Sequence, residues 1–240
     1  SQLVLADQAI QMEQTEEELY EKMAENFEVM CQAVVAGENP SLKSTSGLTG
    51  GEGFKMKEYA QKTAGGLSGS FMTKVMSRAL AVSCCNAAMG RIVATPTAGS
   101  CGILPGCLVS LYEEKKYDKK DIIMAIFTAG AFGLVIAQKA SIAGAQGGCQ
   151  AECGSAAAMA AAALVELAGG SPEASAHACA MAIANQLGLV CDPVAGLVEI
   201  PCIKRNVAGV MIAFSSADMA LAGIKAAIPV DECIDAMREV

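Results

Sequence analysis

The alanine-rich run at residues 155–168 constrains the fold of this chain more than any other stretch. Alanine is the strongest helix former, and the run contains neither glycine nor proline. We therefore predict a helix here. Its surface is apolar almost all round, and a helix of that kind lies at the centre of a protein rather than on its surface.

The composition fits a core of helices that approach one another closely. Hydrophobic residues make up 53% of the 240 residues, aromatic residues only 4%, and tryptophan is absent. Small and aliphatic side chains must therefore fill the core. No stretch shows the sustained alternation of apolar and polar residues that is typical of strands. We predict an all-α fold, a single compact helical domain over residues 1–240, with buried alanine-rich central helices and glycine- and proline-rich active-site loops.

The other helices are expected where apolar residues recur at helical spacing. Residues 122–138 are uncharged, but their glycines and their lack of tryptophan or tyrosine anchors favour a buried central helix over a membrane span. Ser171 and Pro172 form a helix start, with serine as the cap. The expected helices cover residues 6–36, 55–63, 68–89, 103–115, 120–141, 154–167, 172–188, 207–227 and 231–240.

Two loops, at residues 44–51 and 95–102, are rich in glycine and hydroxyl side chains. Loops of this composition present N–H and O–H donors to an anion the size of a carboxylate. Neither contains the Gly-Lys-Ser/Thr sequence of a nucleotide-binding loop. The candidate substrate-binding residues in the two loops are Ser44, Ser46, Gly47, Thr49, Thr97 and Gly99.

Eleven cysteines are the main candidates for metal ligands. Cys149, Cys191 and Cys202 each have a glycine or proline within two residues, which exposes backbone and leaves room for a bulky cluster. Their spacing matches no compact zinc or ferredoxin motif, so the prediction of a shared iron–sulfur cluster rests on this local context. The glycine-rich stretch at residues 144–154 directly precedes the predicted helix at residues 155–168, so its backbone N–H groups are expected to be free to face a ligand. Cys153 lies within this stretch, one helical turn from Cys149, and is a possible fourth ligand. The cysteines within apolar helices are expected to be core residues: Cys84, Cys85, Cys107 and Cys179.

Charge and cysteine content narrow the partners and the compartment. The net charge of −8 disfavours a surface that follows nucleic-acid phosphates, so we expect no nucleic-acid partner and no membrane partner. We see no signal peptide at the N-terminus. The cysteines are then expected to be reduced thiols in the cytoplasm.

Four motifs together resemble one known family. They begin at Ser44 (STSGLTGG), Ala94 (ATPTAGSCGILP), Gly148 (GCQAECG) and Cys191 (CDPVAGLVEIPCIKRN). The chain resembles the iron–sulfur L-serine dehydratases, and it is most similar to the α subunit of the two-chain bacterial members. The resemblance covers almost the whole chain.

This resemblance implies a cofactor, a reaction and partners. It implies a [4Fe-4S] cluster held by Cys149, Cys191 and Cys202, with one iron free, and deamination of L-serine to pyruvate and ammonia. It also implies a separate β subunit and a hetero- or homo-oligomer. The sequence begins close to a predicted helix, and the family continues into a C-terminal tail, so the chain is expected to be truncated at both ends.

The expected reaction is β-elimination, in which the free iron binds the hydroxyl of serine and a base removes the Cα proton. The two loops would hold the carboxylate beside the three cysteines. Lys204 is a candidate base, and the segment 204–206 is either a cationic anchor or a solvated helix start. Serine, cysteine and threonine remain open as substrates. The alternative is a four-cysteine redox or oxygen-sensing module, in which Cys153 is a ligand and there is no lyase activity.

Overall fold

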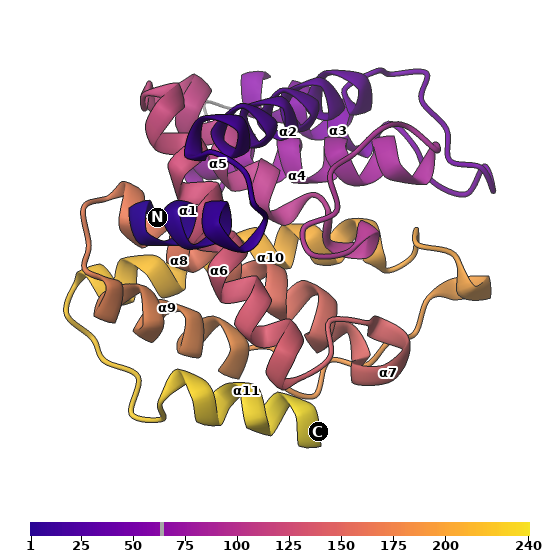
Figure 1. The fold of residues 1–240 in the computed structure, drawn as a ribbon. Coiled ribbons are helices and arrows are strands. Elements are labelled where there is room, and N and C mark those ends of the chain that lie inside the picture. The colour runs from indigo at the N-terminus through magenta and orange to yellow at the C-terminus, as the bar shows by residue number, and fades with distance from the viewer. Residues whose placement is uncertain (63–64) are drawn as a thin grey trace.

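The computed structural model describes residues 1–62 and 65–240, and it confirms the all-α prediction: the described residues contain helices and no strand. Figure 1 shows how the helices are arranged. They are α1 (Gln2–Gln11), α2 (Glu16–Gly37), α3 (Glu52–Lys62), α4 (Gly69–Ala87), α5 (Ile103–Lys115), α6 (Lys119–Lys139), α7 (Gly144–Cys149), α8 (Ser155–Leu167), α9 (Pro172–Ala184), α10 (Cys202–Leu221) and α11 (Val230–Glu239). Short 3-10 turns lie at Ala98–Ser100 and Val194–Gly196, and a π-helical turn lies at Gln150–Gly154.

Helix α8 is the central element, as its alanine content predicts. Residues from Ser155 to Val165 are all buried, and α8 packs against α5, α6, α9 and α10. Four neighbours fit around one helix because alanine side chains let the backbones approach closely. Helix α6 is the one described helix that is long and apolar enough to cross a membrane, but half of its apolar window is buried inside the protein.

Several predicted helix ends are corrected by local chemistry. The helix expected at residues 207–227 begins five residues earlier, at Cys202, and ends at Leu221, where Gly223 adopts a positive φ of 84°. The N-terminal pattern at residues 6–36 divides into α1 and α2, and Thr15 caps α2 through a capping box with Glu18. The predicted cap by Ser171 is present. The predicted end, at Thr63, of the helix expected at residues 55–63 lies outside the described residues.

The glycine-rich stretch at residues 144–154 was expected to leave its backbone N–H groups free before a helix, and this expectation is wrong. The stretch is itself helical, as α7 and the π-helical turn. The N–H group of Gly147 donates to Ala143, and that of Gln150 donates to Leu189, so these donors are already used. Gly148 has a φ of 76° and marks a kink within α7, just before its last residue.

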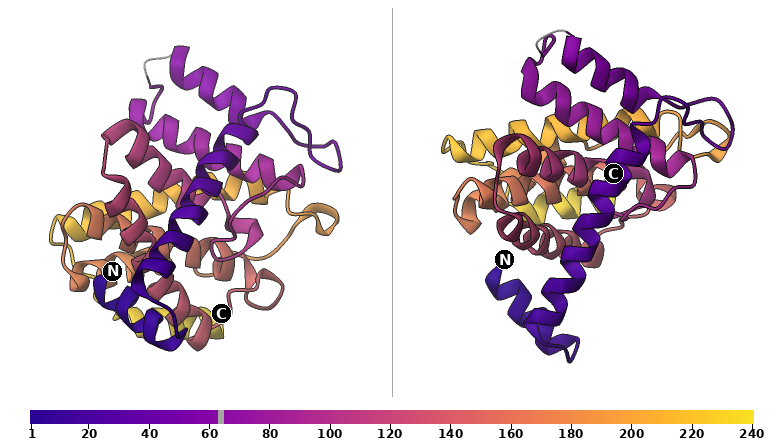
Figure 2. Two further views of the ribbon diagram at one scale, coloured as in Figure 1. Left: turned by 45° about the horizontal axis from the view of Figure 1, so that its top comes forward. Right: turned by 90° about the horizontal axis from the view of Figure 1, so that it is seen from above.

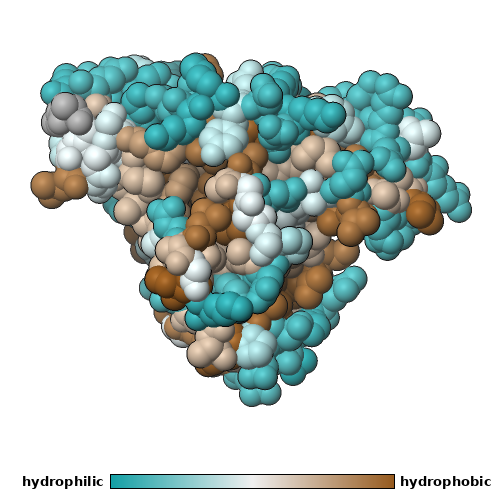
Figure 3. Space-filling view, turned by 90° about the vertical axis from the view of Figure 1, so that its left-hand side faces the viewer, coloured by the Kyte–Doolittle hydropathy of each residue, from teal (hydrophilic) through white to brown (hydrophobic). Residues whose placement is uncertain are grey.

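The connecting segments near the predicted site gather at one side of the molecule. The loop between α2 and α3, the loop between α9 and α10, and α7 all lie at the right-hand side of Figure 1, and Figure 2 shows the two loops together from another direction. The opposite face carries a hydrophilic band along its upper edge with hydrophobic side chains below it (Figure 3). The polar connections that can carry chemistry are therefore held together on one side of a helical scaffold.

The tight approach of α3 and α4 predicts opposite effects for two glycine-to-alanine changes. A Cβ atom at Gly53 would lie 2.7 Å from the Cα atom of Ala81, whereas one at Gly130 would meet nothing within 4 Å. We expect Gly53→Ala to lower the free energy of unfolding by roughly 1–3 kcal/mol because the helices must separate. Gly130→Ala should raise it by about 0.5–1 kcal/mol because alanine favours the helix. Urea unfolding of both variants checks this, and similar stabilisation of both would contradict the packing argument.

Candidate functional site

The start of α10 connects the loop at residues 95–102 with Cys202. The Asn206 side chain is 1% exposed. Its Nδ2 donates to the carbonyl of Gly99 at 2.8 Å and to the carbonyl of Cys202 at 2.8 Å, while its Oδ1 accepts from the N–H group of Gly102 at 2.9 Å. One buried amide therefore uses both of its donors and its acceptor to fix this loop against Cys202.

A second side chain from the same region holds the loop at residues 44–51. Glu199 lies three residues before Cys202, and its Oε2 accepts from the hydroxyl of Ser46 at 2.7 Å and from that of Thr49 at 2.9 Å. The hydroxyls of Ser44 and Ser46 are 3.3 Å apart. The predicted substrate residues of the first loop are thus connected to the cysteine-bearing segment, although about 150 residues separate them in sequence.

Two glutamines fix the segment that carries Cys149 and Cys153. Gln150 is 3% exposed; its Nε2 donates to the carbonyl of Met237 at 3.2 Å, and its Oε1 accepts from the N–H group of Gly188 at 2.8 Å. Gln186 donates to the carbonyl of Cys153 at 3.3 Å. These bonds tie α7 and the π-helical turn to the end of α9 and to α11. The sequence offered no signal for either role, because all three bonds join distant segments.

The sulfur atoms of Cys149 and Cys153 lie 3.5 Å apart in a hydrogen bond. The bond from the Cys153 thiol and the nearby Arg205 guanidinium together lower the pKa of Cys149 to about 7, against the opposing effect of burial. The same bond raises the pKa of Cys153. Cys149 is therefore the thiol of this pair that ionises first, and a thiolate is the form that binds metals.

Arg205 brings the loop that bears Cys191 towards the same place. Its Nη1 donates to the carbonyl of Val190 at 3.0 Å and pairs with Asp192 at 2.7 Å. Cys191 is exposed, and partial burial of its sulfur together with the charges of Glu152 and Cys149 raises its pKa. Burial raises the pKa of Cys202 to about 11, and the neighbouring Cys149 adds to this effect.

The three predicted ligands have the chemistry that an iron–sulfur cluster needs, but the described residues do not bring them together as a metal site. All three are free thiols, and two of them, Cys149 and Cys202, are buried where α7 and α10 begin or end. In the part of the chain that the structure describes, no three His, Cys, Asp or Glu side chains are close enough to hold a metal ion as they stand. Cys191 is exposed, unlike the other two. Thiolate ligands of this kind suit iron–sulfur clusters.

Glu152 was not predicted as a site residue, yet it lies between the second loop and the cysteines. A Cβ atom at Gly99 would lie 3.0 Å from its Oε2, and one at Gly144 would lie 2.6 Å from it. Both glycines therefore allow the carboxylate to lie against backbone. The glycine content of the two segments was visible in the sequence, but the acidic side chain that uses the space was not.

The second loop carries its own hydroxyl network. The hydroxyls of Thr97 and Ser100 are 3.2 Å apart, and that of Ser100 donates to the carbonyl of Thr95 at 3.1 Å. The Thr95 hydroxyl is buried and has no hydrogen-bond partner among the described residues. A buried polar atom without a partner is uncommon and leaves a donor available to a ligand.

Lys204, the candidate base, is exposed on the first turn of α10. It lines a cavity of about 360 Å³ with Glu52, Lys55 and Met56. The residue directly after it, Arg205, is the cation that lies beside Cys149. Of the segment 204–206, the arginine and the asparagine are therefore the side chains that contact the cysteine region.

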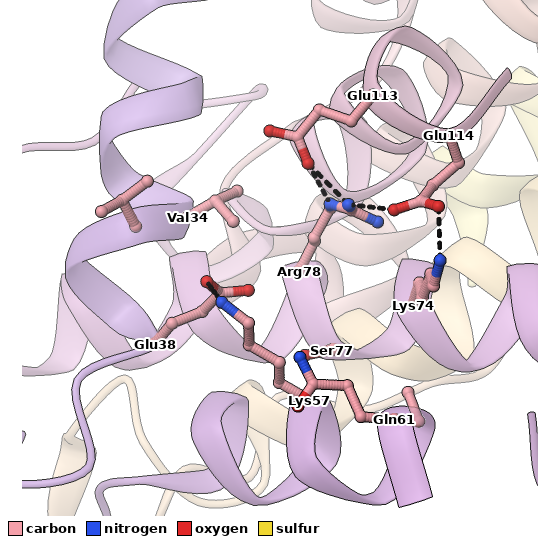
Figure 4. Close-up of a pocket in the computed structure, with 11 residues that line it drawn as sticks. Val34, Glu38, Lys57, Gln61, Lys74, Ser77, Arg78, Glu113 and Glu114 are labelled. Carbon is pink, nitrogen blue, oxygen red and sulfur yellow. Dashed lines mark hydrogen bonds and ion pairs between the residues drawn. The ribbon is translucent and has the colours of Figure 1, made fainter. Parts of the chain in front are cut away.

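A larger charged cavity lies elsewhere, between α2, α3, α4 and α5. Its volume is about 400 Å³. Its cations are paired with carboxylates (Figure 4): Arg78 contacts Glu113 and Glu114, and Lys57 contacts Glu38. The opposite charges in each pair neutralise each other, and the pairs link α3 to the end of α2 and α4 to α5.

The cysteines that were predicted to be core residues, such as Cys107, are buried, and burial raises the pKa of that thiol.

Fold and site together define an all-α protein in which thiols and two hydroxyl-rich loops meet at the start of one helix. The model of the serine dehydratase alpha chain family matches residues 1–240, and the chain belongs to this family.

Three relatives place it more closely. It is 50% identical over 240 residues to the probable L-serine dehydratase, alpha chain, of Bacillus subtilis (strain 168), which covers 100% of this chain and 79% of the relative. It is 46% identical over 239 residues to the L-serine dehydratase, alpha chain, of Peptoniphilus asaccharolyticus, and this match covers 99% of this chain and 81% of the relative. It is 45% identical over 163 residues to L-serine dehydratase 1 of Escherichia coli (strain K12), and this match covers 67% of this chain and 36% of the relative.

The three bonds of Asn206 predict a large loss of stability when they are removed. Asn206→Ala leaves the carbonyls of Gly99 and Cys202 and the N–H group of Gly102 without this partner inside the protein. Each unsatisfied buried group costs about 1–3 kcal/mol, so we expect at least that loss in the free energy of unfolding. Asn26→Ala, an exposed change within α2, is the control and should alter stability by less than about 0.5 kcal/mol. Equal unfolding midpoints for the two variants would contradict the role of Asn206.

The hydrogen bond between Cys149 and Cys153 predicts a pH effect in the chain without metal. Removing the Cys153 thiol should raise the pKa of Cys149 from about 7 towards the ordinary value near 8.5, because the thiolate loses its donor. NMR titration of chain labelled with ¹³C at the cysteine β-carbon would follow Cys149 in Cys153→Ala. Cys179→Ala, a buried cysteine elsewhere, is the control. An unchanged Cys149 midpoint in Cys153→Ala would show that this bond does not set the pKa.

Proposed function

We propose that this chain is the α subunit of an L-serine dehydratase, a lyase that converts L-serine to pyruvate and ammonia by β-elimination. The observation that carries the proposal is the family match over residues 1–240, together with relatives of 50% and 46% identity that are named as L-serine dehydratase alpha chains. The arrangement of two hydroxyl-rich loops beside a group of thiols supports the same reaction.

The proposed cofactor is a [4Fe-4S] cluster held by Cys149, Cys191 and Cys202. The lowered pKa of Cys149 and the burial of Cys202 support this ligand set. With three protein ligands, such a cluster supplies an open iron that acts as a Lewis acid towards the substrate hydroxyl, which is otherwise a poor leaving group.

The chain's own residues would bind and orient the amino acid. Thr97 and Gly99 lie in the loop that Asn206 fixes against Cys202, so a carboxylate held there stays at a constant distance from the cysteines. The buried Thr95 hydroxyl in the same loop is a further donor. Ser44, Ser46, Gly47 and Thr49 would line the other side of the substrate.

A base must remove the Cα proton while the hydroxyl leaves. Lys204 stays the candidate because it follows Cys202 by two residues on the first turn of α10, although its side chain lines the cavity with Glu52 and Lys55 and would have to turn towards the cysteines. The loss of water from serine leaves aminoacrylate, which becomes an imine and is hydrolysed to pyruvate and ammonia without further help from the protein.

The proposal includes a partner chain and a compartment. The relatives' names, which specify an alpha chain, support assembly with a separate β subunit in a hetero-oligomer. A cytoplasmic location follows from the proposed reaction and from the free thiols.

The contact between Cys149 and Cys153 supports one alternative function. Two sulfur atoms 3.5 Å apart would suit a four-cysteine redox or oxygen-sensing cluster in which Cys153 is the fourth ligand. Such a cluster has no open iron and would carry no lyase activity.

Cysteine-to-serine changes separate the two functions. Under the three-ligand proposal, Cys149→Ser, Cys191→Ser and Cys202→Ser should each abolish both the iron–sulfur absorption and pyruvate formation from L-serine. Cys153→Ser should keep iron and sulfide near the wild-type content. The measurements are the anaerobic absorption spectrum, the iron and sulfide content and a pyruvate assay on the loaded α–β enzyme.

Cys31→Ser on α2 is the matched control and should change neither the spectrum nor the turnover, because that cysteine lies outside the site. Loss of the cluster from Cys153→Ser, as complete as that from Cys149→Ser, would favour the four-cysteine module. A colourless wild-type protein that forms no pyruvate would refute the proposed function.

A further inference from the structure

Glu199 is a buried carboxylate without a cationic partner. The residue is 5% exposed. Within the described ranges, 1–62 and 65–240, no lysine, arginine or histidine forms an ion pair with it, and Arg205, on the first turn of α10, is paired with Asp192 at 2.7 Å. Buried carboxylates are rarely found without a partner of opposite charge, because burial disfavours the ionised form.

The surroundings of Glu199 nevertheless favour its ionised form. Burial raises the pKa of this carboxyl, but hydrogen bonds from the hydroxyls of Ser44, Ser46 and Thr49 outweigh burial and lower it. Two of these hydroxyls donate to the same oxygen, Oε2, at 2.7 and 2.9 Å. The structure thus orients an anion at the edge of the cysteine region.

The same bonds limit what the first loop can bind. A hydroxyl has one proton to donate, and Ser46 and Thr49 both donate theirs to Glu199. The N–H groups of Leu48 and Thr49 are also used, by the hydroxyls of Ser46 and Ser44. A substrate carboxylate placed here would find few free donors and would face a negative charge, which repels it. The first loop is better suited to a cationic group.

We propose that Glu199 binds the α-ammonium group of the amino-acid substrate. This inference rests on the proposed function, and it assigns one charged group of the substrate to each loop. The loop at residues 95–102 receives the carboxylate, and Glu199, oriented by Ser46 and Thr49, receives the ammonium group. Because both loops are tied to the segment around Cys202, the two ends of the zwitterion are held on one rigid support.

The assignment explains how the enzyme would select an α-amino acid over other small hydroxy acids. The ammonium group supplies the positive charge that Glu199 lacks in the free protein, so binding removes an unpaired buried charge. A hydroxy acid without nitrogen would leave that charge unpaired and would add a second negative charge nearby.

The test compares two ligands on the cluster-loaded α–β enzyme by titration calorimetry. L-alanine keeps the ammonium and carboxylate groups and has no hydroxyl to lose, whereas 3-hydroxypropionate keeps the carboxylate and hydroxyl and lacks the ammonium group. Glu199→Gln preserves the size of the side chain and an oxygen that accepts from Ser46 and Thr49, but it removes the charge. We expect this variant to bind L-alanine at least tenfold more weakly and 3-hydroxypropionate as tightly as the wild type does, or more tightly.

Two further variants separate ammonium binding from a structural role. Glu199→Asp keeps the charge and should recover part of the preference for L-alanine. Glu58→Gln removes the same charge from an exposed position on α3 and should bind both ligands as the wild type does. The cluster absorption per chain and the thermal unfolding midpoint show whether each variant keeps its fold.

The outcomes are distinct. An equal loss of affinity for both ligands in Glu199→Gln would show that Glu199 only ties the loops together, and unchanged affinity for both would show that it does not contact the ligand. In either case a wild-type enzyme that makes pyruvate leaves the proposed function standing. A loaded wild-type enzyme that forms no pyruvate and binds neither ligand overturns the proposed function, and this assignment falls with it.

Discussion

The candidate site depends on a single buried amide. Asn206 is almost fully enclosed, and a polar side chain in that position is stable only if its donors and acceptor are satisfied. Here they are satisfied by the backbone of the loop at residues 95–102 and by the first turn of α10. The position of that loop is therefore coupled to the position of Cys202. Glu199 repeats the arrangement on the other side of Cys202 by accepting from the loop at residues 44–51.

The alanine-rich core makes this convergence possible. With small side chains along α8, four helices pack around it, and the segments that connect them meet on one side of the molecule. Enzymes commonly carry functional residues on loops that a rigid scaffold positions, because catalytic groups must stay at fixed distances from the substrate. In this chain Gln150 and Gln186 also tie the π-helical turn after α7 to the neighbouring segments.

The sequence was sufficient for the helical fold and for the main site segments, but not for the contacts between them. Alanine content and apolar periodicity predicted α8 and α6, since both are local properties. The roles of Glu199 and Asn206 could not be predicted, because the bonds that tie them to the two loops join residues about 100 or more positions apart. The glycine-rich stretch before α8 was misread as open backbone, because its N–H groups are used by partners such as Leu189 that no local pattern reveals. The ligand set and the substrate residues stay predictions.

The central claim is that both loops and three thiolates surround one amino acid at the start of α10. An anaerobic crystal structure of the cluster-loaded enzyme, with L-alanine bound as an unreactive substrate analogue, tests it most directly. The account predicts a cluster on Cys149, Cys191 and Cys202, the ligand carboxylate on the loop at residues 95–102 and the ammonium group beside Glu199. A ligand bound away from these loops, or a cluster that also binds Cys153, would contradict it.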